Sequence, residues 1–153
     1  MKWVTRERPK IDRIACPWLI RRFIDPEAEF YFVAAERVSE FAASSGATPF
    51  DVAGVELSHD GPLCTFDAFL LRYSLADPHL AELATIVRGA DTDRLDLAPQ
   101  SAGLLAISLG MSRLYADDLE MLRHGMLLYD ALFAWLSQAR DERHTWNPQR
   151  QPV

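Results

Sequence analysis

The sequence lacks the run of roughly eighteen apolar residues that a membrane-spanning helix requires. Its richest apolar segment, residues 103–109, is far too short. The opening residues, MKWVTRERPK, also contain no apolar stretch of the kind found in signal peptides. These absences predict a cytoplasmic protein that is neither inserted in a membrane nor exported.

Cysteine is scarce, since the chain has two such residues, Cys16 and Cys64, far apart in the sequence. Disulfides persist mainly in oxidising compartments, and nothing in the sequence indicates export. We therefore expect both thiols to stay reduced.

Basic residues are outnumbered by acidic ones. The 16 Lys and Arg residues against 22 Asp and Glu residues give a net charge of −6 at pH 7. Such a charge keeps a small domain soluble and opposes binding to a phosphate backbone, so we expect no direct DNA binding. With 49% hydrophobic residues over 153 positions, the chain is long enough for one domain with its own core.

The first third of the sequence contains short runs rich in β-forming residues. We expect strands at residues 2–5 and 30–33, and the second run, FYFV, predicts a strand buried on both faces. Residues 50–58, interrupted at Gly54, predict a hairpin or a bulged strand pair.

Most of the other segments have helical patterns. Pro17 predicts the first turn of a helix or a kink within one. Thr65 and Asp77 indicate helix starts, and Gly89 and Gly110 indicate helix ends. The expected helices cover residues 14–24, 36–43, 66–73, 78–88, 99–110 and 117–140.

Together these patterns predict an α+β fold, with a small early β-sheet of about three to four short strands packed on a predominantly helical C-terminal bundle. We expect a single domain over residues 1–144, followed by a flexible tail over residues 145–153.

Three segments carry polar residues that folding alone does not require. The first connects the first strand to the first helix and contains Lys10, Asp12 and Arg13. Free backbone N–H groups at such a connection, with Lys10 and Arg13 nearby, suit an oxyanion. The alternative is that Asp12 caps the helix it begins, while the basic side chains are solvated or paired with local acids.

The second segment contains four side chains able to bind a first-row transition metal, Glu56, His59, Cys64 and Asp67. Their spacing does not match a zinc motif such as paired C-x-x-C units. Glu56 and His59 converge only if the chain bends between them. The alternative is a solvated histidine in a turn and a cysteine that fills the core.

The third segment places Arg88 at a helix end, followed by Asp91 and Asp93 in a loop. The two aspartates suit a hard cation, or they supply a further ligand to a site around His59. The alternative is a loop braced by Asp–Arg pairs before the next helix.

Four phrases of the sequence are distinctive: PKIDRIACPWLIRRFIDP at 9–26, GVELSHDGPLCTFD at 54–67, IVRGADT at 86–92 and DLAPQSAGLLAISLG at 96–110. Together they resemble the C-terminal domain of the ChrB-type chromate-resistance family. The resemblance runs from about Trp3 to about Trp135, and the three polar segments fall within it. It implies a role in chromate or metal stress, with DNA contact expected in the extra N-terminal region of larger members.

The leading hypothesis is a sensory or accessory domain that binds a transition metal (Zn, Fe or Mn), an oxyanion such as chromate, or both. Glu56 and His59 would hold the metal, with Cys64 and Asp91 as further ligands. The oxyanion would face Lys10, Arg13 and Arg88, and Asp12, Asp67 and Asp93 would support the site.

Two alternatives stay open. One is a hydrolytic or redox metalloenzyme that uses the same metal, with Asp12 or Glu56 as a base and Arg88 stabilising developing charge. The other is a non-catalytic module that forms a homodimer through its C-terminal helices.

Overall fold

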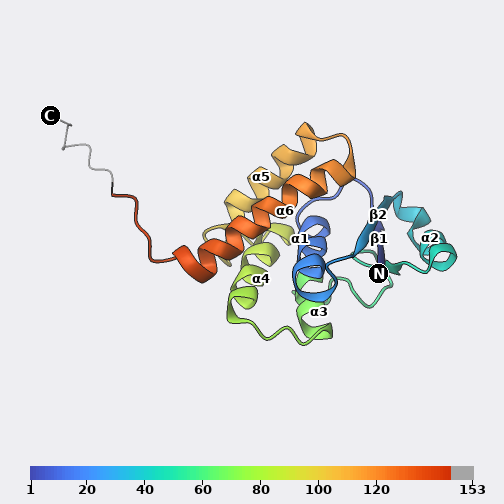
Figure 1. Cartoon of the computed structure of the whole chain (residues 1–153), viewed down its shortest axis with the longest axis horizontal. Coiled ribbons are helices and arrows are strands. Elements are labelled where there is room, and N and C mark those ends of the chain that lie inside the picture. Colours follow the sequence, from blue (N-terminus) through green and yellow to red (C-terminus); the bar gives the residue numbers. More distant parts are fainter. Residues whose placement is uncertain (146–153) are drawn as a thin grey trace.

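The structure, a computed structural model, describes residues 1–145 and shows a small sheet beside a larger group of helices (Figure 1). Within this range the sheet has three parallel strands in the order β2-β1-β3, namely β1 (Lys2–Arg6), β2 (Glu29–Val33) and β3 (Thr48–Pro49). The helices are α1 (Asp12–Leu19), α2 (Val38–Ser45), α3 (Thr65–Arg72), α4 (Pro78–Asp91), α5 (Ser101–Leu114) and α6 (Asp118–Ala134). The predicted α+β class is confirmed.

Three shorter helical segments complete the description. A π-helical turn over Ile20–Ile24 extends α1, another over Trp135–Ala139 extends α6, and a 3-10 turn over Ala35–Arg37 precedes α2. The extent of a single domain over residues 1–144 stays a prediction, and residues 146–153 of the expected tail lie outside the described part of the chain.

The sheet is built around β1, which pairs with a strand on each side. Val4 of β1 is fully buried, whereas Phe30 is the one buried residue of the edge strand β2. Both faces of residues 30–33 pack against core clusters, but only Phe30 is fully buried, so the expected burial is met in part. The reason is that the short helix α2 covers only part of the face that Tyr31 and Val33 present.

The predicted hairpin over residues 50–58 was also wrong. β3 pairs in parallel with β1, and residues 50–64 then form an irregular loop, which we call the connecting loop. Asp51 and Gly54 have positive φ values of 51° and 84°, which turn the chain away from a strand. The Asp51 N–H donates to the Leu57 carbonyl at 2.8 Å and closes this turn.

Of two predicted helix caps, Asp77 is confirmed and Thr65 is wrong. The Asp77 carboxylate accepts the N–H groups of His79 and Leu80 at 2.7 and 3.2 Å, so the predicted cap of α4 is confirmed. Thr65 is not the cap of α3, because Cys64 occupies that position and the Thr65 hydroxyl donates to Asp51 instead.

Gly89 and Gly110, expected at helix ends, lie inside helices, as does Pro17, which was expected in a first turn or at a kink. Pro17 is in the middle of α1, after the first turn, and the helix continues past it into the π-helical turn. Gly110 lies within α5, and Gly89 lies within α4 two residues before its end. At Gly89 the absence of a side chain serves packing, since α5 passes close to α4 at this point.

Substitution of Gly89 by alanine is expected to destabilise the fold by about 1–3 kcal/mol through overpacking. A Cβ atom there would overlap Ser101 Oγ and lie 2.9 Å from the Arg94 carbonyl oxygen. Ser101 cannot easily move, because its buried hydroxyl donates to the Ile86 carbonyl at 2.9 Å. The matched change Gly110→Ala has no atom within 4 Å of the new Cβ and should stabilise α5 by roughly 1 kcal/mol. Urea denaturation of both variants measures the change in the free energy of unfolding. Equal changes for the two variants would contradict the prediction.

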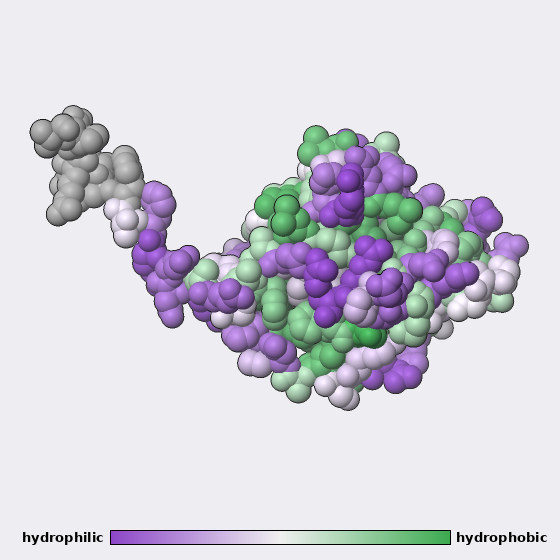
Figure 2. Space-filling view, in the orientation of Figure 1, coloured by the Kyte–Doolittle hydropathy of each residue, from purple (hydrophilic) through white to green (hydrophobic). Residues whose placement is uncertain are grey.

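The main core surrounds α1, which contacts α3, α4 and α6. Trp18 of α1 is buried against Phe66 and Tyr129, with ring centroids 6.5 and 6.2 Å apart. On the face shown in Figure 2, hydrophilic residues are interspersed with apolar ones. Among residues 1–145, no helix combines the length and the apolar character that crossing a bilayer demands.

Candidate metal centre

Polar side chains from four separate parts of the chain meet beyond the carboxyl ends of β1 and β3. Asp12 is the first residue of α1, and Asp51 follows β3. His59 lies in the connecting loop, and Asp91 is the last residue of α4. Because parallel strands end at the same edge of a sheet, this topology brings loops distant in sequence to one place.

The His59 imidazole is at the centre of this group. Its Nε2 atom lies 2.9 Å from Asp91 Oδ2, 3.5 Å from Asp12 Oδ2 and 3.5 Å from Asp51 Oδ1. Within residues 1–145, Asp12, His59 and Asp91 are the one set of three His, Cys, Asp or Glu side chains with mutual ligand-atom distances under 4.8 Å.

These separations fit ligands of one metal ion. Two atoms bound at about 2.1 Å from an ion lie roughly 3.0 to 3.4 Å apart when the bond angle is between about 90° and about 109°. The distances from His59 Nε2 to Asp91 and Asp12 are 2.9 and 3.5 Å. The ligand atoms of all three side chains lie within 4.8 Å of one another, an arrangement compatible with one shared ion.

Asp12 is held in place by α3 and not by its own helix. Its Oδ2 atom accepts the Thr65 N–H at 2.6 Å and its Oδ1 atom accepts the Phe66 N–H at 3.3 Å, so it caps the N-terminus of α3. The interpretation that Asp12 caps the helix it begins was wrong, since Ile11 takes the cap position of α1 without a side-chain bond.

The buried carboxylates repel one another. Burial raises the pKa of Asp12 well above its usual value, and the charges of Asp91 and Asp51 raise it further, although the Thr65 and Phe66 N–H groups act in the opposite direction. Burial and the Asp51 charge also raise the pKa of Asp91, while the charge of His59 lowers it. A bound cation would relieve this repulsion.

Asp51 has other partners that occupy both of its oxygens. Oδ1 accepts the Thr65 hydroxyl at 2.8 Å, and Oδ2 forms ion pairs with Arg6 at 3.0 Å and with Arg13 at 3.3 Å. Two guanidinium groups therefore balance part of the Asp51 charge, although that charge still raises the pKa of Asp12 and Asp91. Neither Asp51 nor Arg6 was among the residues selected from the sequence.

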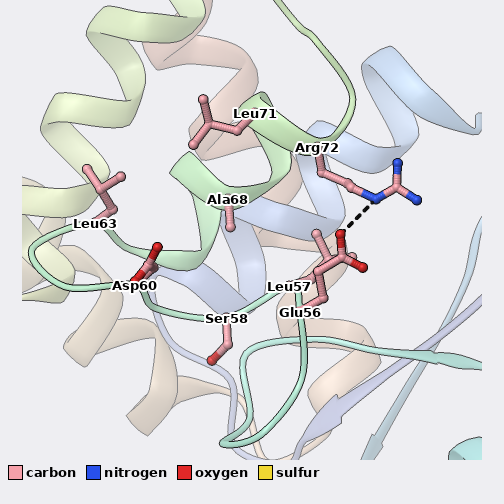
Figure 3. A pocket seen from close by; sticks show the side chains of 8 residues that line it. All are labelled: Glu56, Leu57, Ser58, Asp60, Leu63, Ala68, Leu71 and Arg72. Atoms are coloured by element: carbon pink, nitrogen blue, oxygen red, sulfur yellow. Dashed lines mark ion pairs between the residues drawn. The ribbon is translucent and has the colours of Figure 1, made fainter.

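The structure does not bring Glu56 to the centre. Its side chain is 75% exposed and pairs with Arg72 at 3.0 Å. Figure 3 shows this pair at one end of a separate pocket, lined also by Leu57, Leu63 and Leu71. His59 and Glu56 lie three residues apart, but the connecting loop directs the two side chains to different places.

Cys64 is buried at the start of α3, where its Sγ atom lies 3.3 Å from Asp67 Oδ2. Burial raises the pKa of this thiol far above its usual range, which disfavours the thiolate that binds metals. Cys16 is also buried, and both cysteines are free, as expected.

Of the other aspartates, Asp67 pairs with Arg88 at 2.6 Å, while Asp93 is exposed just beyond α4.

The three basic residues assigned to an oxyanion have separate surroundings. Arg13 donates to the Arg6 and Glu7 carbonyls in addition to its pair with Asp51. Arg88 of α4 is bound to Asp67 of α3, while the bracing pair within the loop after α4 is Arg94 with Asp96 at 2.8 Å. Lys10 is partly buried beside α5 and α6. Both arginines are thus neutralised by carboxylates.

A family model described as the C-terminal domain of ChrB matches residues 3–136, which include every residue of the centre. The chain belongs to the ChrB C-terminal domain family. The resemblance noted from the sequence is thereby confirmed.

One curated relative indicates how much of a larger family member this chain covers. Protein ChrB of Cupriavidus metallidurans is 32% identical over 140 residues, which are 91% of this chain and 42% of that protein. The chain therefore spans less than half the length of this relative. No solved structure matches the chain.

Proposed function

We propose that this ChrB domain binds a divalent transition-metal ion through Asp12, His59 and Asp91, and that it acts as a sensory or accessory domain in chromate resistance. The observation that carries the proposal is the convergence of these three side chains from α1, the connecting loop and α4 at separations suited to one ion. Family membership supports the link to chromate.

The donor set favours a transition metal over magnesium or calcium. An imidazole suits Zn, Fe or Mn, whereas magnesium and calcium prefer oxygen ligands alone. Two carboxylates, Asp12 and Asp91, would balance the charge of a divalent ion. Hydrogen bonds from the Thr65 and Phe66 N–H groups hold Asp12 in a fixed orientation, as second-sphere partners do in metal sites.

The exposure of the three residues indicates where a further ligand would approach. The His59 side chain is 40% exposed, while that of Asp12 is 1% exposed. Three protein ligands leave at least one position of the ion open, and that position would lie on the His59 side. Chromate is a tetrahedral dianion, and we propose that it reaches this open position, because Arg13 and Arg88 are already paired.

Thermal melting with elemental analysis tests the proposal. Zn²⁺ or Mn²⁺ at about a hundred times its Kd should stabilise the chain by about 2.7 kcal/mol, which corresponds to a rise in Tm of roughly 5–10 °C for a domain of this size. Dialysed protein should retain about one ion per chain. His144→Ala removes an exposed histidine and should change neither result. Absence of bound metal and of any shift would refute the metal site.

A second melting experiment tests whether chromate binds through the metal. Chromate added to the metal-loaded protein should raise Tm further, while chromate or sulfate added to the metal-free protein should not. A shift that appears without metal would instead support an oxyanion pocket at Lys10, Arg13 and Arg88.

A further inference from the structure

We propose that the free edge of β2 binds an extended, basic segment of another polypeptide, which adds a strand to the sheet. This surface is separate from the metal centre, and the proposal does not depend on the function proposed above. It rests on the hydrogen-bonding pattern of β2, a groove beside it and the two carboxylates that line that groove.

The backbone of β2 has one side without a partner. In a parallel pair, alternate residues direct both their N–H and C=O groups to the neighbouring strand. Glu29 donates to the Met1 carbonyl at 2.9 Å, and the Val33 carbonyl accepts the Glu7 N–H at 2.8 Å, so residues 29, 31 and 33 face β1. Phe30 and Phe32 therefore direct their polar groups outward, where no strand of residues 1–145 pairs with them.

A groove follows this edge. It has a volume of about 340 Å³ and lies between residues 30–33 on one side and residues 116–119 on the other. The second wall is the turn that joins α5 to α6, near β2 in Figure 1. Four strand residues span about 13 Å, so the groove matches an extended segment of similar length. Leu119, which is 56% exposed, offers an apolar contact to it.

The charge of the groove favours a basic occupant. Asp117 and Asp118 both line it. Asp118 Oδ1 is buried and accepts no hydrogen bond from residues 1–145, while its Oδ2 atom accepts the Arg8 N–H at 3.0 Å. The Arg8 guanidinium lies 3.9 Å from Oδ1 and is engaged by carbonyl groups of the same turn. Asp117 is exposed and the Asp118 side chain is 17% exposed, so the groove presents negative charge to a lysine or arginine side chain.

Strand addition is an established way to bind an extended peptide, because backbone hydrogen bonds provide affinity and flanking side chains provide selectivity. Here Phe30 and Phe32 would pair with the incoming backbone, and Asp118 would select a basic side chain. An exposed edge also permits pairing between two copies of the same chain. The experiment below separates these two occupants.

The test uses the peptide acetyl-Val-Lys-Val-Lys-Val-amide at millimolar concentration, with amide hydrogen exchange and chemical shifts followed by NMR. The peptide should slow exchange at Phe30 and Phe32 and shift residues 116–119. The same peptide with N-methyl groups on alternate amides, or with glutamate in place of lysine, should bind at least about tenfold more weakly. Asp118→Asn should weaken binding of the lysine peptide, and Glu36→Gln, at an exposed acid outside the groove, should not.

The proposal is overturned if the lysine peptide leaves Phe30 and Phe32 unprotected, or if the N-methylated peptide binds equally well to the wild-type chain. It is also overturned if both amides become protected without peptide as the protein concentration rises. Sedimentation would then show a dimer, and the edge would belong to a second copy of the chain.

Discussion

Replacing His59 with alanine is expected to weaken Zn²⁺ or Mn²⁺ binding by at least about 100-fold, which corresponds to roughly 2.7 kcal/mol. His59 is the one nitrogen donor of the proposed ligand set, and its Nε2 atom lies 2.9 Å from Asp91 and 3.5 Å from Asp12. Without it, two carboxylates that repel each other remain. Competition with a chromophoric chelator at neutral pH gives the Kd of each variant.

Glu56→Ala provides a matched control within the same loop. The sequence favoured Glu56 as a ligand, but its side chain is 75% exposed and paired with Arg72. We therefore expect this variant to bind metal as the wild-type chain does. A loss equal to that of His59→Ala would show that the connecting loop rearranges on binding and that the proposed ligand set is wrong.

The metal-free protein should lose stability as the pH rises above about 4, the ordinary pKa of an aspartate. Folding raises the pKa of Asp12 and Asp91. A carboxyl whose folded pKa is above its unfolded value contributes stability that is complete below the unfolded pKa and is lost as the pH rises through the folded pKa. Each such group changes the free energy of unfolding by up to about 1.4 kcal/mol per pH unit.

Asp12→Asn should make this pH dependence shallower, because it removes one titrating carboxyl and its repulsion with Asp91. Its amide oxygen can still accept one N–H at the start of α3. Urea denaturation in the presence of a chelator measures the slope. Asp96→Asn is the control, since that exposed carboxyl has its pKa lowered by Arg94 and the variant should keep the wild-type slope in this range. Equal slopes for Asp12→Asn and the wild-type chain would contradict the account of the buried carboxylates.

The sequence correctly predicted features of the fold that depend only on residues close together in the chain. Asp77 before Pro78 defined the start of α4, because a side chain and the backbone two residues later are enough to form that cap. Gly89 could not be interpreted in the same way. Its role depends on Ser101, which reaches it only after α4 and α5 have packed together.

The candidate centre likewise contains residues that their own chemistry identified and residues that only the fold brings in. His59 and Asp91 were selected as ligands because of their chemistry, and the structure brings them together. Asp12 was given a supporting role, because nothing in the sequence shows that it caps α3, more than fifty residues away. Asp51 was missed because residues 50–58 resembled a hairpin. If β3 had been predicted as a strand parallel to β1, as the structure shows, Asp51 would have been expected beside the carboxyl end of β1.

Anomalous diffraction from crystals soaked in Mn²⁺ or Zn²⁺ tests the central claim most directly. The account predicts one strong anomalous peak per chain, within bonding distance of His59 Nε2 and of carboxylate oxygens from Asp12 and Asp91. It also predicts that this peak is absent from His59→Ala crystals soaked in the same way. A wild-type map without a peak between these three side chains, or with its main peak at another position, would contradict it.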